Sequence, residues 1–311
     1  MPRLGRVFRD ATRGRRLRGL ATMAGSALSN QVGAAVGAHA FDAVGPPGVV
    51  AVRQWVAAAV LLPLARPPVR RLRWSQWWPV LLLALVFATM NLSLYTAIDR
   101  VGLGLAVTLE FLGPLGVALA GSRTRRDLLI ALVAAAGVYV LVLPGPASDV
   151  AGLVIGAVAG CCWAAYILLN RLAGARLPGL QAPAVASALC AVGYLPVLVV
   201  LAAQDRLTGA PLLAAVAAGV LSSAVPYAAD LVALRYVPAR AFGVAMSAHP
   251  VLAALVGMVL LGQFLPVHVW VGIAVVVLAN AAAVVGTASA GRAGCRSGAT
   301  PGEVAPLGAG R

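Results

Sequence analysis

The chain has 311 residues, of which 61% are hydrophobic and 11% are charged, with a mean hydropathy of +0.93. A soluble domain carries about 25% charged residues, so this composition excludes a water-soluble protein and indicates a membrane-embedded one. The formal net charge of +15 comes from arginines that lie in loops between apolar stretches. No recognition helix, RNP motif or zinc finger accompanies them, so we expect no nucleic-acid partner.

Ten apolar stretches follow one another along the chain, and each is close to the roughly 20 residues that a helix needs to cross a bilayer. An arginine-rich cytoplasmic segment without regular structure, 1–19, precedes the first; that first stretch is too long for a signal peptide. A disordered cytoplasmic tail, 289–311, follows the last. The predicted spans are 20–42, 47–65, 77–98, 101–121, 127–143, 151–170, 182–203, 211–234, 239–261 and 267–288.

The arginines alternate between the two sides of these predicted spans. The tails and the even-numbered loops hold 21 of them, whereas the odd-numbered loops hold only Arg100 and Arg206, and Arg53 lies inside a span. Cytoplasmic loops carry the excess of basic residues in membrane proteins. The pattern therefore predicts a multi-pass protein of the bacterial plasma (inner) membrane with both termini in the cytoplasm.

The two halves of the chain carry matching interruptions. A shift of 136 positions places Pro114 of the fourth span on Pro250 of the ninth, and Gly113 adjoins the first proline. Five spans per half, 20–143 and 151–288, give the halves opposite orientations. We therefore predict an all-α membrane protein of ten transmembrane helices in two inverted five-helix repeats, with helix breaks at Gly113, Pro114 and Pro250, an arrangement typical of transporters that work by alternating access.

Small residues recur at intervals of four in two of the spans. Gly152, Gly156 and Gly160 form two successive steps on the sixth span, and Gly33 and Gly37 form one on the first. Glycines at this spacing let membrane helices approach closely. We expect both motifs to lie at helix–helix contacts.

Ionisable residues inside a membrane are costly and usually line a cavity or pair with another charge. Glu110 lies one turn before Pro114; it either binds a substrate ammonium or carries a coupling proton, or it pairs with Arg53 or caps exposed backbone donors. His249 directly precedes Pro250; it either exchanges a proton or is a neutral histidine bonded to a carbonyl that the proline frees.

Arg53 and Asp230 have alternative interpretations too. Arg53 either binds a substrate carboxylate through its planar guanidinium, or it neutralises Glu110 or Asp42, or its side chain extends to the outer membrane–water interface. Asp230 either contacts substrate or pairs locally with Arg235. Polar and aromatic residues add cavity candidates, although tyrosine and tryptophan also form interfacial belts: Asn91, Tyr95, Trp163, Tyr166 and Tyr227.

No pattern for catalysis or metal binding is present in the sequence. We find no nucleotide-binding loop, GxSxG, HExxH or dinucleotide fingerprint, so we expect neither an enzyme nor a cofactor. The cysteines lack the spacing of metal ligands, and we expect no metal; they are Cys161, Cys162, Cys190 and Cys295.

Three stretches resemble a known family. They are similar to signatures of bacterial threonine/homoserine exporters. The stretches are residues 107–115 (VTLEFLGPL), residues 160–168 (GCCWAAYIL) and the region 221–247, which begins with LSSAVPY and ends with VPARAFGVAMS. These exporters belong to the EamA family of the drug/metabolite transporter superfamily, and the ten-span, two-repeat plan resembles that family as well. The resemblance covers about residues 20–288.

The resemblance implies proton-driven export of small amino acids such as threonine and homoserine, and it makes Glu110 part of a characteristic motif. Two positions depart from the family pattern in charge, because the family usually has glutamate where His249 and Gln263 stand here. Asp230 also replaces a glutamate but keeps its charge. The expected partners are a small-molecule substrate and membrane lipid, with a homodimer left open. An exporter of another metabolite or drug, and a non-transport membrane sensor or assembly factor, remain alternatives.

Overall fold

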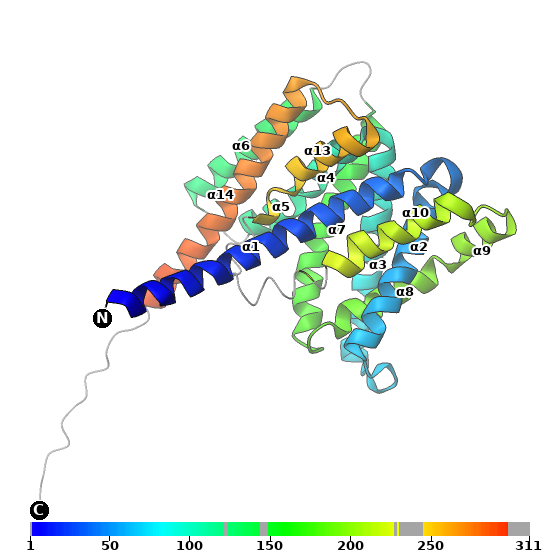
Figure 1. The fold of residues 1–311 in the computed structure, drawn as a ribbon, viewed down its shortest axis with the longest axis horizontal. Coiled ribbons are helices and arrows are strands. Elements are labelled where there is room, and N and C mark those ends of the chain that lie inside the picture. Colours follow the sequence, from blue (N-terminus) through cyan, green and yellow to red (C-terminus); the bar gives the residue numbers. More distant parts are fainter. Residues whose placement is uncertain (1, 121–123, 144–148, 227–228, 230–244, 298–311) are drawn as a thin grey trace, which may run out of the picture.

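The computed structural model describes residues 2–120, 124–143, 149–226, 229 and 245–297, and all regular structure in these ranges is helical (Figure 1). Short 3-10 and π-helical turns, η1 and η2, accompany the α-helices. The elements are α1 (Pro2–Ala38), α2 (Phe41–Ala65), η1 (Val69–Arg71), α3 (Trp74–Val101), α4 (Leu103–Glu110), α5 (Leu112–Ala120), α6 (Arg125–Val142), α7 (Val150–Gly174), α8 (Gln181–Gly193), α9 (Leu195–Ala203), α10 (Gly209–Gly219), η2 (Val220–Ala224), α13 (His249–Leu261) and α14 (Val267–Ser297).

Six segments are long and apolar enough to cross a bilayer, which confirms the predicted class of all-α membrane protein. They are α2, α3, α4 with α5, α7, α8 with α9, and the first part of α14. Two shorter apolar helices, Gly209–Ala224 and His249–Leu261, lie in the predicted eighth and ninth spans. The predicted first and fifth spans lie in α1 and α6, which are not among these six segments, and the remainder of the eighth and ninth spans lies largely outside the described residues. The count of ten therefore stays a prediction.

The two ends of the chain differ from what the sequence predicts. We expected residues 1–19 and 289–311 to lack regular structure, but α1 begins at Pro2 and α14 continues to Ser297. Alanine and arginine favour helix formation, and adding a residue to an existing helix costs far less than starting one. Residues 2–19 therefore extend α1 and residues 289–297 extend α14, whereas residues 298–311 lie outside the described residues.

The helices of the two halves pack against each other. α3 lies along α7, α6 along α14 and α2 along α8, while α4 packs on α13 and α7. Figure 1 shows α6 and α14 side by side, and the free ends of α1 and α14 at the same end of the molecule. The interior of the protein is therefore an interface between the first and second halves of the chain.

Both glycine motifs lie at close helix contacts, as the sequence predicts. A Cβ atom on Gly160 of α7 would lie 2.7 Å from the Leu109 carbonyl oxygen, and one on Gly156 would lie 2.8 Å from Leu109 Cδ1. On α1, a Cβ on Gly33 would overlap Ser222, and one on Gly37 would lie 3.0 Å from Ala218 Cβ. Larger residues at these positions would push α7 and α1 away from their neighbours.

Large apolar side chains cover the outside of the bundle. Leu85, Leu128, Val259 and Leu278 are each more than 60% exposed. A soluble protein rarely exposes so much apolar surface, whereas lipid chains solvate it without cost. The exposed surface thus agrees with the composition.

Candidate functional site

Two helical segments are interrupted by a turn shortly before a proline. α4 ends at Glu110, Phe111 forms a turn, and α5 begins at Leu112. In the second half, a turn at residues 247–248 precedes α13, which begins at His249. The shift of 136 positions that aligns the prolines also aligns Phe111 with Ser247.

Each break has a physical cause in the proline that follows it. Proline has no N–H, so the carbonyl four residues earlier loses its helical partner; here those carbonyls belong to Glu110 and Met246. Pro114 and Pro250 lie in the first turns of α5 and α13, where proline is tolerated. The residues whose carbonyls are released, Glu110 and Met246, both line one cavity.

This cavity has a volume of about 220 Å³ and lies where α1, α2, α3, α4, α7, η2 and α13 meet. About 15 Å³ measured in this way is enough for one water molecule, so the cavity has room for a small solute. Seven of the residues that the sequence singles out line it: Arg53, Asn91, Tyr95, Glu110, Trp163, Tyr166 and His249.

Arg53 is held by neutral groups. Its Nη1 donates to Asn91 Oδ1 at 2.9 Å, its Nη2 to the Ser222 carbonyl at 3.2 Å and its Nε to Ser223 Oγ at 3.3 Å. The guanidinium carbon also lies 5.2 Å from the centre of the Tyr95 ring, a cation–π contact. Arg53 forms no ion pair with Glu110 or Asp42 within the described residues, so its positive charge is fixed in place but not neutralised.

Glu110 brings a carboxyl group to the same cavity. Its side chain is 6% exposed, and within the described ranges it takes part in no hydrogen bond or ion pair. In this part of the chain, Glu110 therefore neither forms an ion pair with Arg53 nor caps a backbone donor. A buried carboxyl group and a partly buried guanidinium thus line one cavity without a hydrogen bond or ion pair between them in the described structure.

His249 has a partner that the sequence did not predict. Gln31 Nε2 lies 3.2 Å from His249 Nδ1, whereas Nε2 of the ring is buried with no partner in the described structure. The Phe111 ring lies 5.4 Å from the imidazole, centre to centre. The alternative in which His249 bonds a freed carbonyl is therefore not seen in the described structure, where a side-chain contact with α1 is made instead.

Aromatic rings form the rest of the wall. Phe111 meets Trp163 edge-on with 4.5 Å between ring centres, and Phe87 lies 5.7 Å from Tyr166. Such pairs are rigid and apolar. They supply an apolar part of the cavity wall.

Some predicted residues lie elsewhere, and others were missed. Tyr227 and Asp230 fall outside the described residues. Gly113, Pro114 and Pro250 shape the breaks and do not line the cavity; a Cβ on Gly113 would overlap the Gly160 carbonyl oxygen.

The sequence analysis missed several polar residues that line the cavity. They are uncharged polar residues in apolar segments, a pattern that also marks functional positions: Ser26, Asn30, Gln31, Ser222 and Ser223.

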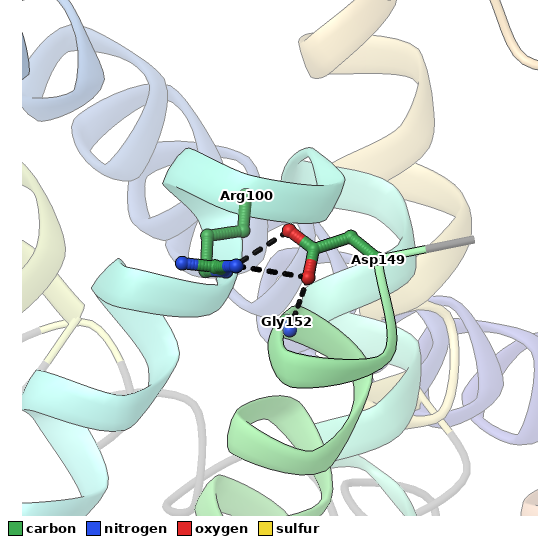
Figure 2. A network of polar contacts seen from close by, with 3 residues as sticks. All are labelled: Arg100, Asp149 and Gly152. Atoms are coloured by element: carbon green, nitrogen blue, oxygen red, sulfur yellow. Dashed lines mark hydrogen bonds and ion pairs between the residues drawn. The ribbon is translucent and has the colours of Figure 1, made fainter. Parts of the chain in front are cut away.

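A second polar cluster lies where the end of α3 meets the start of α7, and its residues do not line the cavity (Figure 2). Arg100 holds Asp149 through two contacts, Nε to Oδ2 at 2.9 Å and Nη2 to Oδ1 at 3.0 Å. Asp149 also accepts from the Gly152 N–H at 2.9 Å and so caps α7. The bond from Arg100, and then the one from Gly152, hold the pKa of Asp149 below its ordinary value.

Gln263, the other departure from the family pattern, lies beside this cluster. Its Oε1 accepts from the Leu103 N–H at 2.9 Å and caps the start of α4. Gln263 therefore has a capping role, whereas His249 lines the cavity.

Metal ligands are absent from the residues that the structure covers: no three of histidine, cysteine, aspartate and glutamate gather there. The described cysteines, Cys161, Cys162 and Cys190, are free thiols.

Comparison with known proteins gives consistent matches. The profile of the EamA-like transporter family matches residues 150–285. The threonine/homoserine exporter RhtA of Salmonella typhimurium is 38% identical over 240 residues, covering 76% of this chain and 81% of the relative. RhtA of Escherichia coli K12 is 35% identical over the same coverage, and the uncharacterized transporter YwfM of Bacillus subtilis is 28% identical over 220 residues.

A solved crystal structure shares the fold. It covers 89% of this chain and 98% of its own with a TM-score of 0.55 and 19% identity. The apolar helices and the cavity between them are those of a multi-pass membrane protein of the transporter class. With the identity to RhtA over most of both chains, they show that this chain belongs to the EamA-like transporter family.

Proposed function

We propose that this protein is a secondary transporter that exports small amino acids of the threonine and homoserine kind across the bacterial inner membrane. The observation that carries the proposal is the placement of Arg53 and Glu110 in one cavity. A zwitterionic amino acid has one carboxylate and one ammonium group, and these two side chains complement them. The relatives named threonine/homoserine exporters support the same substrate class.

The mechanism that we propose is alternating access between two inverted five-helix repeats, residues 20–143 and 151–288, with ten spans and both termini in the cytoplasm. The paired breaks before Pro114 and Pro250 support this, because matched interruptions in two halves mark the binding site of such carriers. Glu110 is the residue that we assign to proton coupling. It lines the cavity and is free of ion pairs within the described residues, so both a proton and an ammonium group have access to it.

In this topology the Arg100–Asp149 pair and Gln263 lie at the outer end of the cavity. Arg100 belongs to the first repeat and Asp149 precedes the second, and Gln263 of the second repeat caps α4 of the first. We propose that these contacts close the outer side and separate when the repeats rock apart. Contacts between repeats at one end are what an alternating carrier must break in each cycle.

Flux of radiolabelled threonine in proteoliposomes with an imposed proton gradient tests the proposal. We expect threonine efflux that depends on the gradient and is lost in Glu110→Gln. Flux of a nucleobase or drug but not of amino acids would favour an exporter of another substrate. Absence of flux for every solute, from correctly inserted protein, would favour a sensor or assembly factor instead.

A further inference from the structure

The contact between Gln31 and His249 links two distant parts of the chain inside the cavity. Gln31 on α1 is 3% exposed and His249 at the start of α13 is 5% exposed, and both line the cavity. The side-chain amide nitrogen of Gln31 lies 3.2 Å from His249 Nδ1. Neither residue is charged in this pairing, in contrast to the glutamate that the family pattern has at position 249.

The chemistry of the pair determines where the imidazole carries its hydrogen. An amide nitrogen only donates hydrogen bonds, so Nδ1 must accept. In a neutral histidine the other ring nitrogen is then protonated, because the bond made by one nitrogen fixes the state of the other. His249 therefore carries its hydrogen on Nε2.

That Nε2–H group is left without an acceptor. Four buried side-chain atoms lack a hydrogen-bond partner in the described part of the protein, and two of them, His249 Nε2 and the Tyr95 hydroxyl, belong to residues that line this cavity. Buried polar groups are almost always bonded, and each exception calls for an explanation. A bound solute with oxygen atoms would satisfy both.

We propose that Gln31 fixes His249 as a neutral Nε2–H donor, and that this donor binds a hydroxyl or carboxylate oxygen of the transported solute. The inference rests on the proposed function and makes it more specific. His249 serves recognition, whereas we assign proton transfer to Glu110. Gln31 is a positioning residue that acts through His249.

The tautomer is measured directly on the full-length protein, labelled with ¹⁵N-histidine and reconstituted in lipid bilayers. The chain has only three histidines, so the variant His249→Leu identifies the His249 signals. We expect a neutral ring with hydrogen on Nε2. Gln31→Glu, whose carboxylate accepts from Nδ1–H, should move the hydrogen to Nδ1 or charge the ring, and Gln31→Leu should remove the preference.

Gln54→Leu is the matched control, since Gln54 is a buried glutamine, 2% exposed, that does not line the cavity. It should leave the His249 signals unchanged. A wild-type ring with hydrogen on Nδ1, a charged ring, or a tautomer that does not respond to Gln31→Leu would overturn the inference.

The role in recognition is tested by adding L-threonine to the labelled protein. We expect the Nε2 signal to shift and His249→Leu to weaken threonine binding about tenfold, the effect of one lost hydrogen bond. If threonine is transported but the Nε2 signal does not move, this inference fails and the proposed function stands. If no amino acid is transported while the tautomer is as expected, the proposed function fails alone.

Discussion

The cavity and the Arg100–Asp149 cluster handle charge in opposite ways. In the cluster, a carboxylate and a guanidinium satisfy each other through two contacts at the partly exposed end of the bundle. In the cavity, Glu110 is buried and Arg53 is partly buried, yet neither takes part in an ion pair within the described residues. Burying a charge without a partner is costly, so the protein gives up stability in the cavity that a binding function can explain.

The largest effect is expected at Glu110. Glu110→Gln removes the ionisable carboxyl group but keeps the shape of the side chain. We expect threonine export to fall by at least about 30-fold, because losing one side of a buried charged contact costs several kcal/mol. Thermal stability should stay equal or rise, because the unpaired carboxyl group is gone. Transport by proteoliposomes and melting curves measure the two effects. A variant that transports normally would exclude Glu110 from the mechanism.

A somewhat smaller loss is expected from Arg53→Gln. The proposed contact between Arg53 and the carboxylate of threonine is lost, so affinity for threonine should fall about tenfold. Three hydrogen bonds within the protein disappear as well, to Asn91, Ser223 and the Ser222 carbonyl. Stability should fall by about 1–3 kcal/mol as well, because the freed partners are left unsatisfied. The exposed Arg66→Gln is the control and should change neither quantity. If only stability changed, Arg53 would be structural.

Gly160→Ala tests whether the shape of the cavity depends on close helix packing. The added methyl group would lie 2.7 Å from the Leu109 carbonyl oxygen, so we expect a destabilisation of about 1–3 kcal/mol. Gly116→Ala is the control, since nothing lies within 4 Å of its Cβ position. Denaturation in detergent compares the two variants, and equal stability would contradict the close approach of α7 to α4.

The smallest effect is expected from Asp149→Asn. The pKa of Asp149 is lower in the folded protein than its ordinary value. The carboxylate therefore stabilises the fold above that ordinary value and ceases to do so as pH falls through the lowered one. The difference in melting temperature between wild type and variant should be small at about pH 7 and should shrink as the pH falls below about 3.9, the ordinary pKa of aspartate. A difference that grows on acidification would reverse the sign and contradict the assignment.

The sequence predicts the class of fold and much of the site for a clear physical reason. Proline interrupts a helix in any context, so Pro114 and Pro250 mark the breaks without knowledge of tertiary structure. Charged residues such as Glu110 and Arg53 are so costly in lipid that their presence inside a span predicts a cavity. Both signals act through local chemistry.

The rest of the site depends on packing between distant segments. Gln31 lies 218 positions from His249, and nothing in the local pattern of α1 shows that it faces α13. Ser222 and Ser223 bind Arg53 only because η2 packs beside α2. The helical structure at the free ends of α1 and α14 was not predicted. The polar composition of these ends indicates that they are not buried, but it does not show whether an adjoining helix continues into them.

Binding of radiolabelled L-threonine to purified protein, compared between wild type and Glu110→Gln, tests most directly whether the cavity is the solute site. We predict saturable binding by the wild type and a loss of at least about 30-fold in affinity in the variant. Saturable binding of equal affinity in both proteins would contradict the assignment of the cavity.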